Sequence, residues 1–479
     1  MPSGLEQLLH DAAALHRFVE GIHQFCSEQR SGQTYIRPTT DFFAYLEQLA
    51  QATKAYICQL ATTTDLSPEG ITLARKDLQH IKSYWRILHA FIKPAADAHV
   101  LQLPAPLINF AASQLTTIEG MSGSKVVVLL TPELMYFQTP HTELKQTASD
   151  LAQIIPEAKF PEGLGFVELP YSQGLNLFTN LALYHELGHF AFEELRQSEA
   201  GDEAIGKLDL AIKQALKEAL KARLAKDYDT LPANTKASIV RILWNWTQEV
   251  FADLVALRLA GPAFTFALIE VFNLLGLQDE PQQVKFNESH PSSALRLNQH
   301  LELLKDEGWW DTLKDLDAGH RELLEELAGK AHKSTLYLDG KPAKVDAGFV
   351  AAFRTVLPEI RSLVAGITIN NGASATEFTQ ARDKIERALM NGVVPSCFWK
   401  EDATAAPHPI AVMNAAFCCY LTKLPALMEG LQDQSASDVK ARSFWTQRLE
   451  GWTLKAVEDY GIIKEYESAQ HERYLRKEN

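Results

Sequence analysis

Cysteine is scarce in this chain, with five residues among 479 and no C-x-x-C pair. A sparse, odd set does not form a disulfide framework, and the neighbours Cys418 and Cys419 lie in an apolar run that favours buried free thiols. Long hydrophobic runs are also missing: the longest, Pro262 to Leu277, is too short to span a bilayer and contains Glu270. The segment from Met1 to Glu28 lacks the apolar core of a signal peptide. We therefore expect a cytoplasmic protein without a membrane span.

The sequence has no block of basic residues. Its 46 lysines and arginines stand against 60 aspartates and glutamates, so the formal net charge is −14. Nucleic acids and anionic membranes bind cationic surfaces, and this balance argues against both as partners. Neither G-x-G-x-x-G nor a Walker-type loop occurs, so no nucleotide site is indicated.

What is present is an ordinary globular composition, 46% hydrophobic and 22% charged, with apolar residues mostly at helical spacing. We predict a mainly α (α+β) fold in three parts: an N-terminal helical region over 1–104, a central domain over 105–305 and a C-terminal helical region over 306–479. Lys93-Pro94 is expected to end the last helix of the first part. Strands at 126–130 and 165–169 predict a small sheet. The second strand is either an exposed edge that pairs with an extended peptide or a short structural strand.

The motif His185-Glu186-Leu187-Gly188-His189 lies in an apolar-periodic stretch from about Asn176 to Leu195. On a helix, side chains four residues apart share a face, with Cβ atoms about 5–6 Å apart. Two imidazoles so placed can bind one zinc ion, and the adjacent glutamate can act as a general base. Gly188 costs helix stability, about 1 kcal/mol relative to alanine, which suggests that another element approaches closely there. The alternative is an ordinary helix with two histidines and no metal.

A second predicted helix, from about Thr235 to Leu259, carries Glu249 and Asp253 four residues apart. Their neighbours on that face include Ile242 and Trp246, and a carboxylate in apolar surroundings is costly unless it is paired or binds a metal. Glu249 as a third ligand would give a His, His, Glu site with an open fourth position. Asp253 would then accept a hydrogen bond from a ligating histidine. The alternative is that both are exposed residues of an amphipathic helix.

A third element, His290-Pro291 through Arg296-Leu297, reads H-P-x-x-x-x-R-L. In content, order and spacing, the three motifs resemble those of the gluzincin zinc peptidases, and most of all the prenyl-protein endopeptidase-like branch. The resemblance covers roughly residues 165 to 300. It implies a zincin-like core, Zn²⁺ as the cofactor, and His185, His189 and Glu249 as its ligands.

The same resemblance implies roles for the other motif residues. Glu186 would be the general base and Asp253 would support a ligand. His290 would donate to the developing oxyanion, and Arg296 would bind substrate or pair with a carboxylate or carbonyl in the site. The alternative for His290-Pro291 is a cap on the helix that begins near Ser292. Members of that branch are usually embedded in membranes, whereas this chain has no spanning segment, so a soluble substrate is expected.

These inferences predict a zinc-dependent peptidase that acts on a peptide or protein through a metal-activated water, with Glu186 as the base. Two alternatives stay open. One is a catalytically silent zincin used as a binding or regulatory module. The other is a metal-dependent amidohydrolase acting on a non-peptide substrate, because the motifs specify the metal and the water but not the acyl group.

Overall fold

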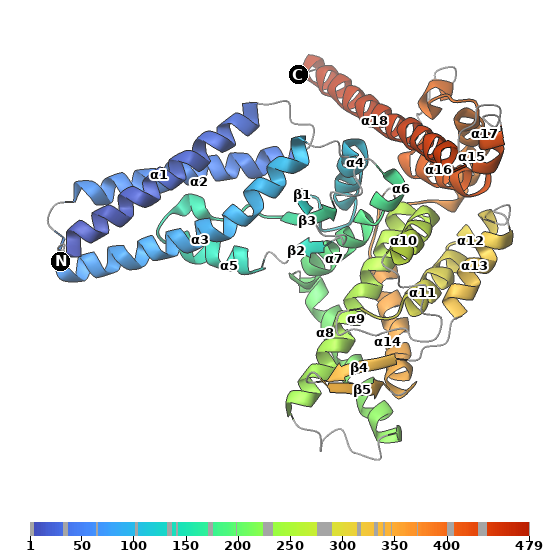
Figure 1. The fold of residues 1–479 in the computed structure, drawn as a ribbon, viewed down its shortest axis with the longest axis horizontal. Coiled ribbons are helices and arrows are strands. Elements are labelled where there is room, and N and C mark those ends of the chain that lie inside the picture. The colour runs from blue at the N-terminus through green and yellow to red at the C-terminus, as the bar shows by residue number, and fades with distance from the viewer. Residues whose placement is uncertain are drawn as a thin grey trace. The chain divides into compact units, whose positions relative to one another are not determined.

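The structure is a computed structural model, and it is mainly helical, as the sequence predicts (Figure 1). The residues it describes are 4–31, 37–63, 66–100, 104–131, 137–139, 142–170, 176–197, 199–223, 233–274, 290–313, 318–329, 334–338, 341–345, 347–370, 372–399, 407–429 and 438–478. Within these ranges no helix is both long enough and apolar enough to cross a membrane.

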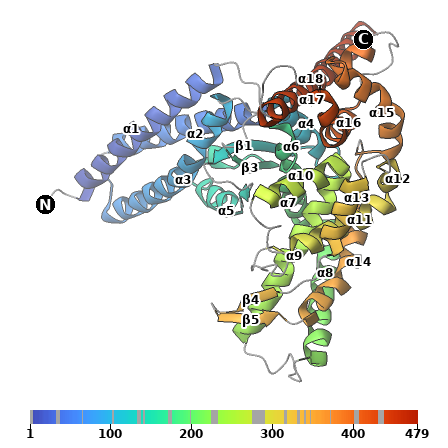
Figure 2. The same ribbon diagram turned by 45° about the vertical axis from the view of Figure 1, so that its right-hand side comes forward.

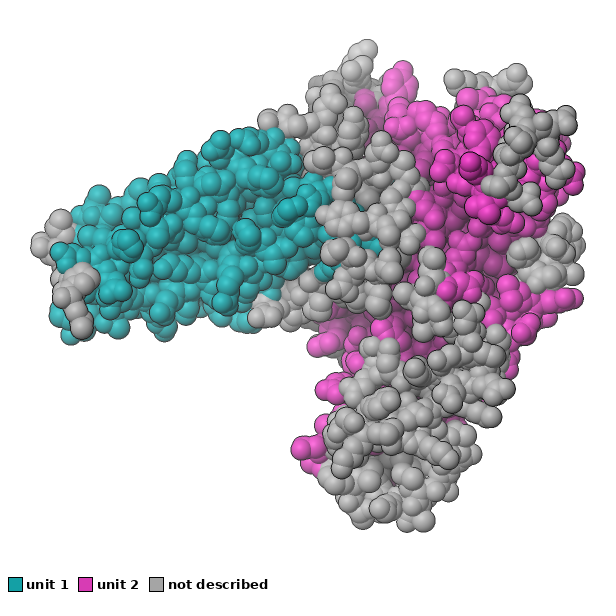
Figure 3. Space-filling model, in the orientation of Figure 1, with its two compact units in different colours: residues 1–105, 123–174 teal, residues 106–122, 175–479 magenta. Residues whose placement is uncertain are grey.

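The chain forms two compact units, coloured separately in Figure 3. Unit 1 comprises Met1–Ala105 and Gly123–Gly174, and unit 2 comprises Pro106–Ser122 and Leu175–Asn479. These units divide the chain differently from the three predicted parts. Both predicted strands belong to unit 1, and the C-terminal third shares unit 2 with the H-E-x-x-H segment. The division of the chain into three functional regions stays a prediction.

Unit 1 is built on three long helices that run alongside one another (Figures 1 and 2). They are α1 (Gly4–Ser31), α2 (Arg37–Thr62) and α3 (Pro68–Val100). Their apolar residues recur every three to four positions, so each helix has one face in a common core with Leu46, Trp85 and Phe166. The prediction that Lys93-Pro94 ends the third helix is wrong, because α3 continues for six residues beyond Pro94. Ala95 and Ala98 are buried, and this packing stabilises the last part of the helix enough to offset the destabilising effect of the proline.

A small mixed sheet completes unit 1. In the sequence, α5 (Thr142–Leu151) and the short helix η1 (Pro156–Ala158) come between its second and third strands. Strands β1 (Lys125–Thr131) and β3 (Leu164–Pro170) match the two predicted strands and pair in parallel, with Val127 opposite Phe166. Strand β2 (Phe137–Thr139) pairs antiparallel to β3 on its other side. The sheet order is therefore β1-β3-β2. The exposed-edge interpretation of 165–169 is wrong, because β3 is the central strand and is paired on both sides.

Unit 2 contains the remaining described elements. They are α4 (Ala105–Leu115, whose first residue belongs to unit 1), α6 (Leu177–Asn180), α7 (Leu183–Gln197), α8 (Glu199–Arg223), α9 (Ala233–Ala260), α10 (Pro262–Leu274), α11 (Ser293–Asp306), α12 (Trp309–Thr312), α13 (Ala318–Gly329), the hairpin β4 (Ser334–Leu338) and β5 (Lys341–Val345), α14 (Ala347–Gly366), α15 (Ala375–Met390), η4 (Pro395–Trp399), α16 (Pro409–Thr422), α17 (Leu424–Glu429) and α18 (Asp438–Glu478). The predicted helices that carry the first two motifs correspond to α7, with α6 before it, and to α9.

Helices α7 and α9 pack directly against each other at the centre of unit 2 (Figures 1 and 2). The rings of Phe192 and Phe251 meet edge to face with centroids 4.9 Å apart. One helical turn before Phe192, Gly188 faces the backbone of Ala252. A Cβ atom on Gly188 would lie 2.6 Å from the Cα of Ala252, a separation that real Cβ atoms do not adopt. The glycine within the motif is therefore what lets the two helices approach.

Gly188→Ala is expected to push α7 away from α9 and to lower the free energy of unfolding by about 1–3 kcal/mol or more, since the clash is with backbone. The midpoint of urea denaturation measures this change. Gly206→Ala on α8 is the matched control, because a Cβ there meets nothing within 4 Å. That variant should gain stability from the better helix former, by about 1 kcal/mol at most. Equal stability of the two variants would contradict the role given to Gly188.

Candidate metal centre

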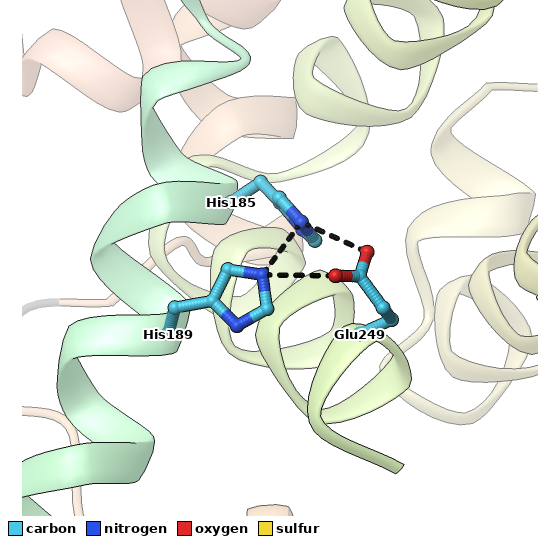
Figure 4. A group of neighbouring side chains, drawn as sticks. All are labelled: His185, His189 and Glu249. Carbon is cyan, nitrogen blue, oxygen red and sulfur yellow. Dashed lines mark hydrogen bonds and ion pairs between the residues drawn. The ribbon is translucent and has the colours of Figure 1, made fainter. Parts of the chain in front are cut away.

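His185 and His189 on α7 and Glu249 on α9 point toward one another (Figure 4). The Nε2 atoms of the two imidazoles are 3.0 Å apart. The Nε2 of His185 lies 3.3 Å from Oε2 of Glu249, and the Nε2 of His189 lies 3.3 Å from its Oε1. His185 and Glu249 are buried, and the His189 side chain is 15% exposed. The packing of α7 on α9 thus brings together residues about 60 positions apart in the sequence, and this group could hold a metal ion.

The distances fit a tetrahedral ion of the size of zinc. Ligand atoms about 2.0–2.1 Å from such an ion, at tetrahedral angles, lie about 3.3 Å from one another. The three observed separations are 3.0, 3.3 and 3.3 Å. Moreover, Oε2 of Glu249 is buried and has no well-formed hydrogen bond within the described part of the chain. A buried carboxylate oxygen and two convergent imidazole nitrogens form a donor set suited to a divalent cation.

Asp253 determines which nitrogen of His185 faces the group. Its Oδ1 is 2.9 Å from Nδ1 of His185, and its side chain is fully buried. A carboxylate only accepts hydrogen bonds, so Nδ1 carries the proton and donates it to Asp253. When His185 is neutral, this leaves the lone pair on Nε2, the nitrogen that lies beside His189 and Glu249, as a metal ligand requires. The predicted contact between Asp253 and one of the two motif histidines is present, and metal binding by that histidine stays a prediction.

Arg296 on α11 pairs with Asp253 through two hydrogen bonds. Its Nε donates to Oδ2 at 2.6 Å and its Nη2 donates to Oδ1 at 2.7 Å, while Nη1 lies 3.3 Å from Oε2 of Glu249. The guanidinium is buried, with only 5% of the residue exposed. Of the roles expected for Arg296, the pairing with a carboxylate is present. Binding of substrate stays a prediction, and the occupied N–H groups favour a positioning role instead.

The electrostatics of the group favour a bound cation. Burial alone would raise the carboxyl pKa values, but the two imidazoles hold the pKa of Glu249 well below its usual range, and Arg296 with His185 does the same for Asp253. Burial alone would lower the pKa of His185, but Asp253 and Glu249 outweigh it and raise this pKa to about 10. Without a metal, the carboxylates therefore draw a proton onto His185.

Glu186 follows His185 on α7 and is 5% exposed. Burial raises the pKa of its carboxyl group, against the opposing effect of the His185 and His189 imidazoles. A carboxylate whose pKa is raised toward neutrality is a better proton acceptor, which is the property a general base needs. The two motif carboxylates on α9 differ from Glu186 in this respect. The pKa values of Glu249 and Asp253 are lowered, because their neighbours stabilise both as anions.

His290 lies at the rim of the group, with its Nε2 3.5 Å from Oε1 of Glu249 and a side chain that is 35% exposed. Burial lowers its pKa, although the Glu249 carboxylate opposes the change. The helix cap is a different residue: Ser292 is the N-cap of α11, and its Oγ accepts a hydrogen bond from the amide of Leu295. His290 is therefore beside the three candidate ligands, where a neutral imidazole could donate a hydrogen bond.

Two sets of residues around the centre were not predicted from the sequence. Tyr184 donates a hydrogen bond of 2.6 Å to Gln114 of α4, which in turn donates to the carbonyl of Leu259 at the end of α9, so Gln114 links α7 to α9. His300 on α11 lies behind Asp253, with its Nε2 3.6 Å from Oδ2. Only its spacing of four residues from Arg296 could have suggested His300, because that spacing places both on one helix face.

Comparisons of this chain with protein-family models, with curated proteins and with solved structures find no match. The resemblance to gluzincin peptidases therefore depends on the three motifs.

Proposed function

We propose that this chain is a zinc-dependent peptidase of gluzincin type, with a zincin-like core formed by α7, α9 and α11. The observation that carries the proposal is the meeting of His185, His189 and Glu249 at 3.0 to 3.3 Å. Glu186, the adjacent buried carboxyl group with a raised pKa, supplies the base that such a site needs. A metal site without catalysis would need the ligands but not this second carboxylate.

In the proposed reaction, His185, His189 and Glu249 would hold the zinc ion, which would supply Lewis-acid chemistry to the scissile carbonyl and to water. Glu186 takes a proton from the attacking water and passes it to the leaving amine, acting first as base and then as acid. His290, neutral because its pKa is lowered and partly exposed at the rim, donates a hydrogen bond to the carbonyl oxygen as negative charge develops there.

Asp253 and Arg296 do not touch the substrate in this proposal. Asp253 keeps His185 in the tautomer that presents Nε2. Arg296 keeps Asp253 anionic and in one orientation through its paired hydrogen bonds. A peptide or protein substrate and a cytoplasmic location stay predictions.

Removal of the metal tests the proposal. The wild-type protein, incubated with a mixture of random decapeptides, is expected to cleave some of them when zinc is present. Treatment with a chelator should abolish cleavage, and addition of one equivalent of zinc should restore it. Mass spectrometry of the products measures both steps. One bound zinc without cleavage of any peptide would favour the silent binding module, and hydrolysis confined to small non-peptide amides would favour the amidohydrolase.

A further inference from the structure

A fully buried imidazole, that of His300, lies next to Asp253. His300 on α11 has no exposed surface, and its Nδ1 is 3.0 Å from Oγ1 of Thr265 on α10, which is also fully buried. Its Nε2 is directed at Oδ2 of Asp253 from 3.6 Å and has no hydrogen-bond partner among the described residues. A buried polar atom without a partner costs about 1–3 kcal/mol, so a packing role alone does not explain a histidine here.

The neighbours of His300 determine its tautomer. The Thr265 hydroxyl can donate to Nδ1, whereas the Asp253 carboxylate can only accept. The arrangement that suits both has a lone pair on Nδ1 and a proton on Nε2, facing Asp253. The other tautomer would place a lone pair against a carboxylate oxygen, and burial of both side chains strengthens that repulsion. Phe264 stacks on the imidazole, with ring centroids 5.4 Å apart and planes 28° apart, and so fixes the ring plane.

We propose that His300, held by Thr265, is a positioning residue of the metal centre. This inference rests on the proposed function. Oδ1 of Asp253 already meets two donors, the Nδ1 of His185 and the Nη2 of Arg296. Oδ2 accepts a hydrogen bond from the Nε of Arg296 and lies 3.6 Å from the Nε2 of His300. With donors on both oxygens, the carboxylate stays oriented toward His185.

The length of the His300 contact limits the size of the effect. At 3.6 Å it is longer than a hydrogen bond and acts as an electrostatic attraction. Loss of a direct hydrogen-bond partner of a ligand weakens metal binding by about 10–100-fold. Loss of the His300 contact should weaken zinc binding by less, roughly threefold to tenfold.

The test measures the zinc dissociation constant of the full chain by competition with a chromophoric chelator. Thr265→Val keeps the shape of the side chain but removes the hydroxyl that fixes the His300 tautomer, and it should weaken zinc binding roughly threefold to tenfold. His300→Leu should weaken it similarly. His300→Gln should restore most of the affinity, because the glutamine amide nitrogen and the histidine Nε2 are both four bonds from Cα. Thr453→Val is the matched control, since Thr453 is also fully buried and its hydroxyl donates to the carbonyl of Leu449 within α18.

Each outcome decides the inference. Unchanged affinity in Thr265→Val and His300→Leu, alongside weaker binding by Asp253→Asn, would overturn the role of His300 and leave the proposed function standing. His300→Gln binding as weakly as His300→Leu would also overturn it, because the N–H group would then not be the active feature. If the wild type binds no zinc, the proposed function fails and this inference fails with it.

Discussion

Glu186→Gln is expected to retain zinc and to lower the turnover of peptide substrates by about three orders of magnitude, or about 4 kcal/mol of transition-state stabilisation. Glutamine has nearly the size of glutamate but cannot take a proton from water. The ligands are unaffected, because His185, His189 and Glu249 make their mutual contacts without Glu186. The measurement is kcat on a peptide that the wild type cleaves, together with zinc per chain by elemental analysis.

The separate effects on kcat and KM distinguish a general base from a residue that only supports the structure. KM should change little, since a group that acts only in the transition state lowers kcat and kcat/KM together. Glu458→Gln on α18 provides the control, because it makes the same chemical change in a half-exposed ion pair with Lys455. Turnover of Glu186→Gln equal to that of the wild type would remove Glu186 from the mechanism.

Glu249→Ala is expected to lose most of its zinc, from about one ion per chain in the wild type to well below one after identical dialysis. The variant keeps the two imidazoles of α7 but removes the one candidate ligand that α9 contributes among the described residues. Two neutral ligands bind zinc far more weakly than the three-ligand arrangement of catalytic sites. Elemental analysis of both proteins, purified side by side, measures the change.

Two further variants distinguish the loss of a zinc ligand from a general destabilisation of the fold. Glu249→Gln keeps the size of the side chain and should also lose zinc, because an amide is a poor zinc ligand. Glu270→Ala removes another partly buried carboxyl group, on α10, and should keep its zinc. Equal zinc in the wild type and Glu249→Ala would mean that α7 and α9 do not share a site, and the resemblance to gluzincin peptidases would lose its main support.

The sequence alone located helices α7 and α9 and the three residues that meet between them, whose role as metal ligands stays a prediction. His185 and His189 face one way because a helix repeats every 3.6 residues, and the same rule sets Glu249 and Asp253 side by side on α9. Capping and breaking residues limit helices locally, and α9 ends at Ala260 before Gly261, close to the predicted end. Motifs of this kind act over one or two turns, so a single sequence reveals them.

Only the tertiary structure decided how these helices meet. The approach of Gly188 to Ala252 brings Glu249 to the imidazoles, and neither helix specifies that contact by itself. Packing also overrode local signals: α3 passes through Pro94 because the residues after it are buried.

The contacts between elements could not be predicted from the sequence, for the same reason. Strand β3 lies at the centre of its sheet because strands before it in the chain pair with both its edges. Arg296 binds Asp253, and Thr265 and His300 lie behind that pair, because α10 and α11 pack where they do. Hydrogen bonds between residues tens of positions apart depend on the whole fold, since burial decides which polar groups must find partners within the protein. The sequence determined which residues could bind a metal, and the packing of α7, α9 and α11 determined that they lie together.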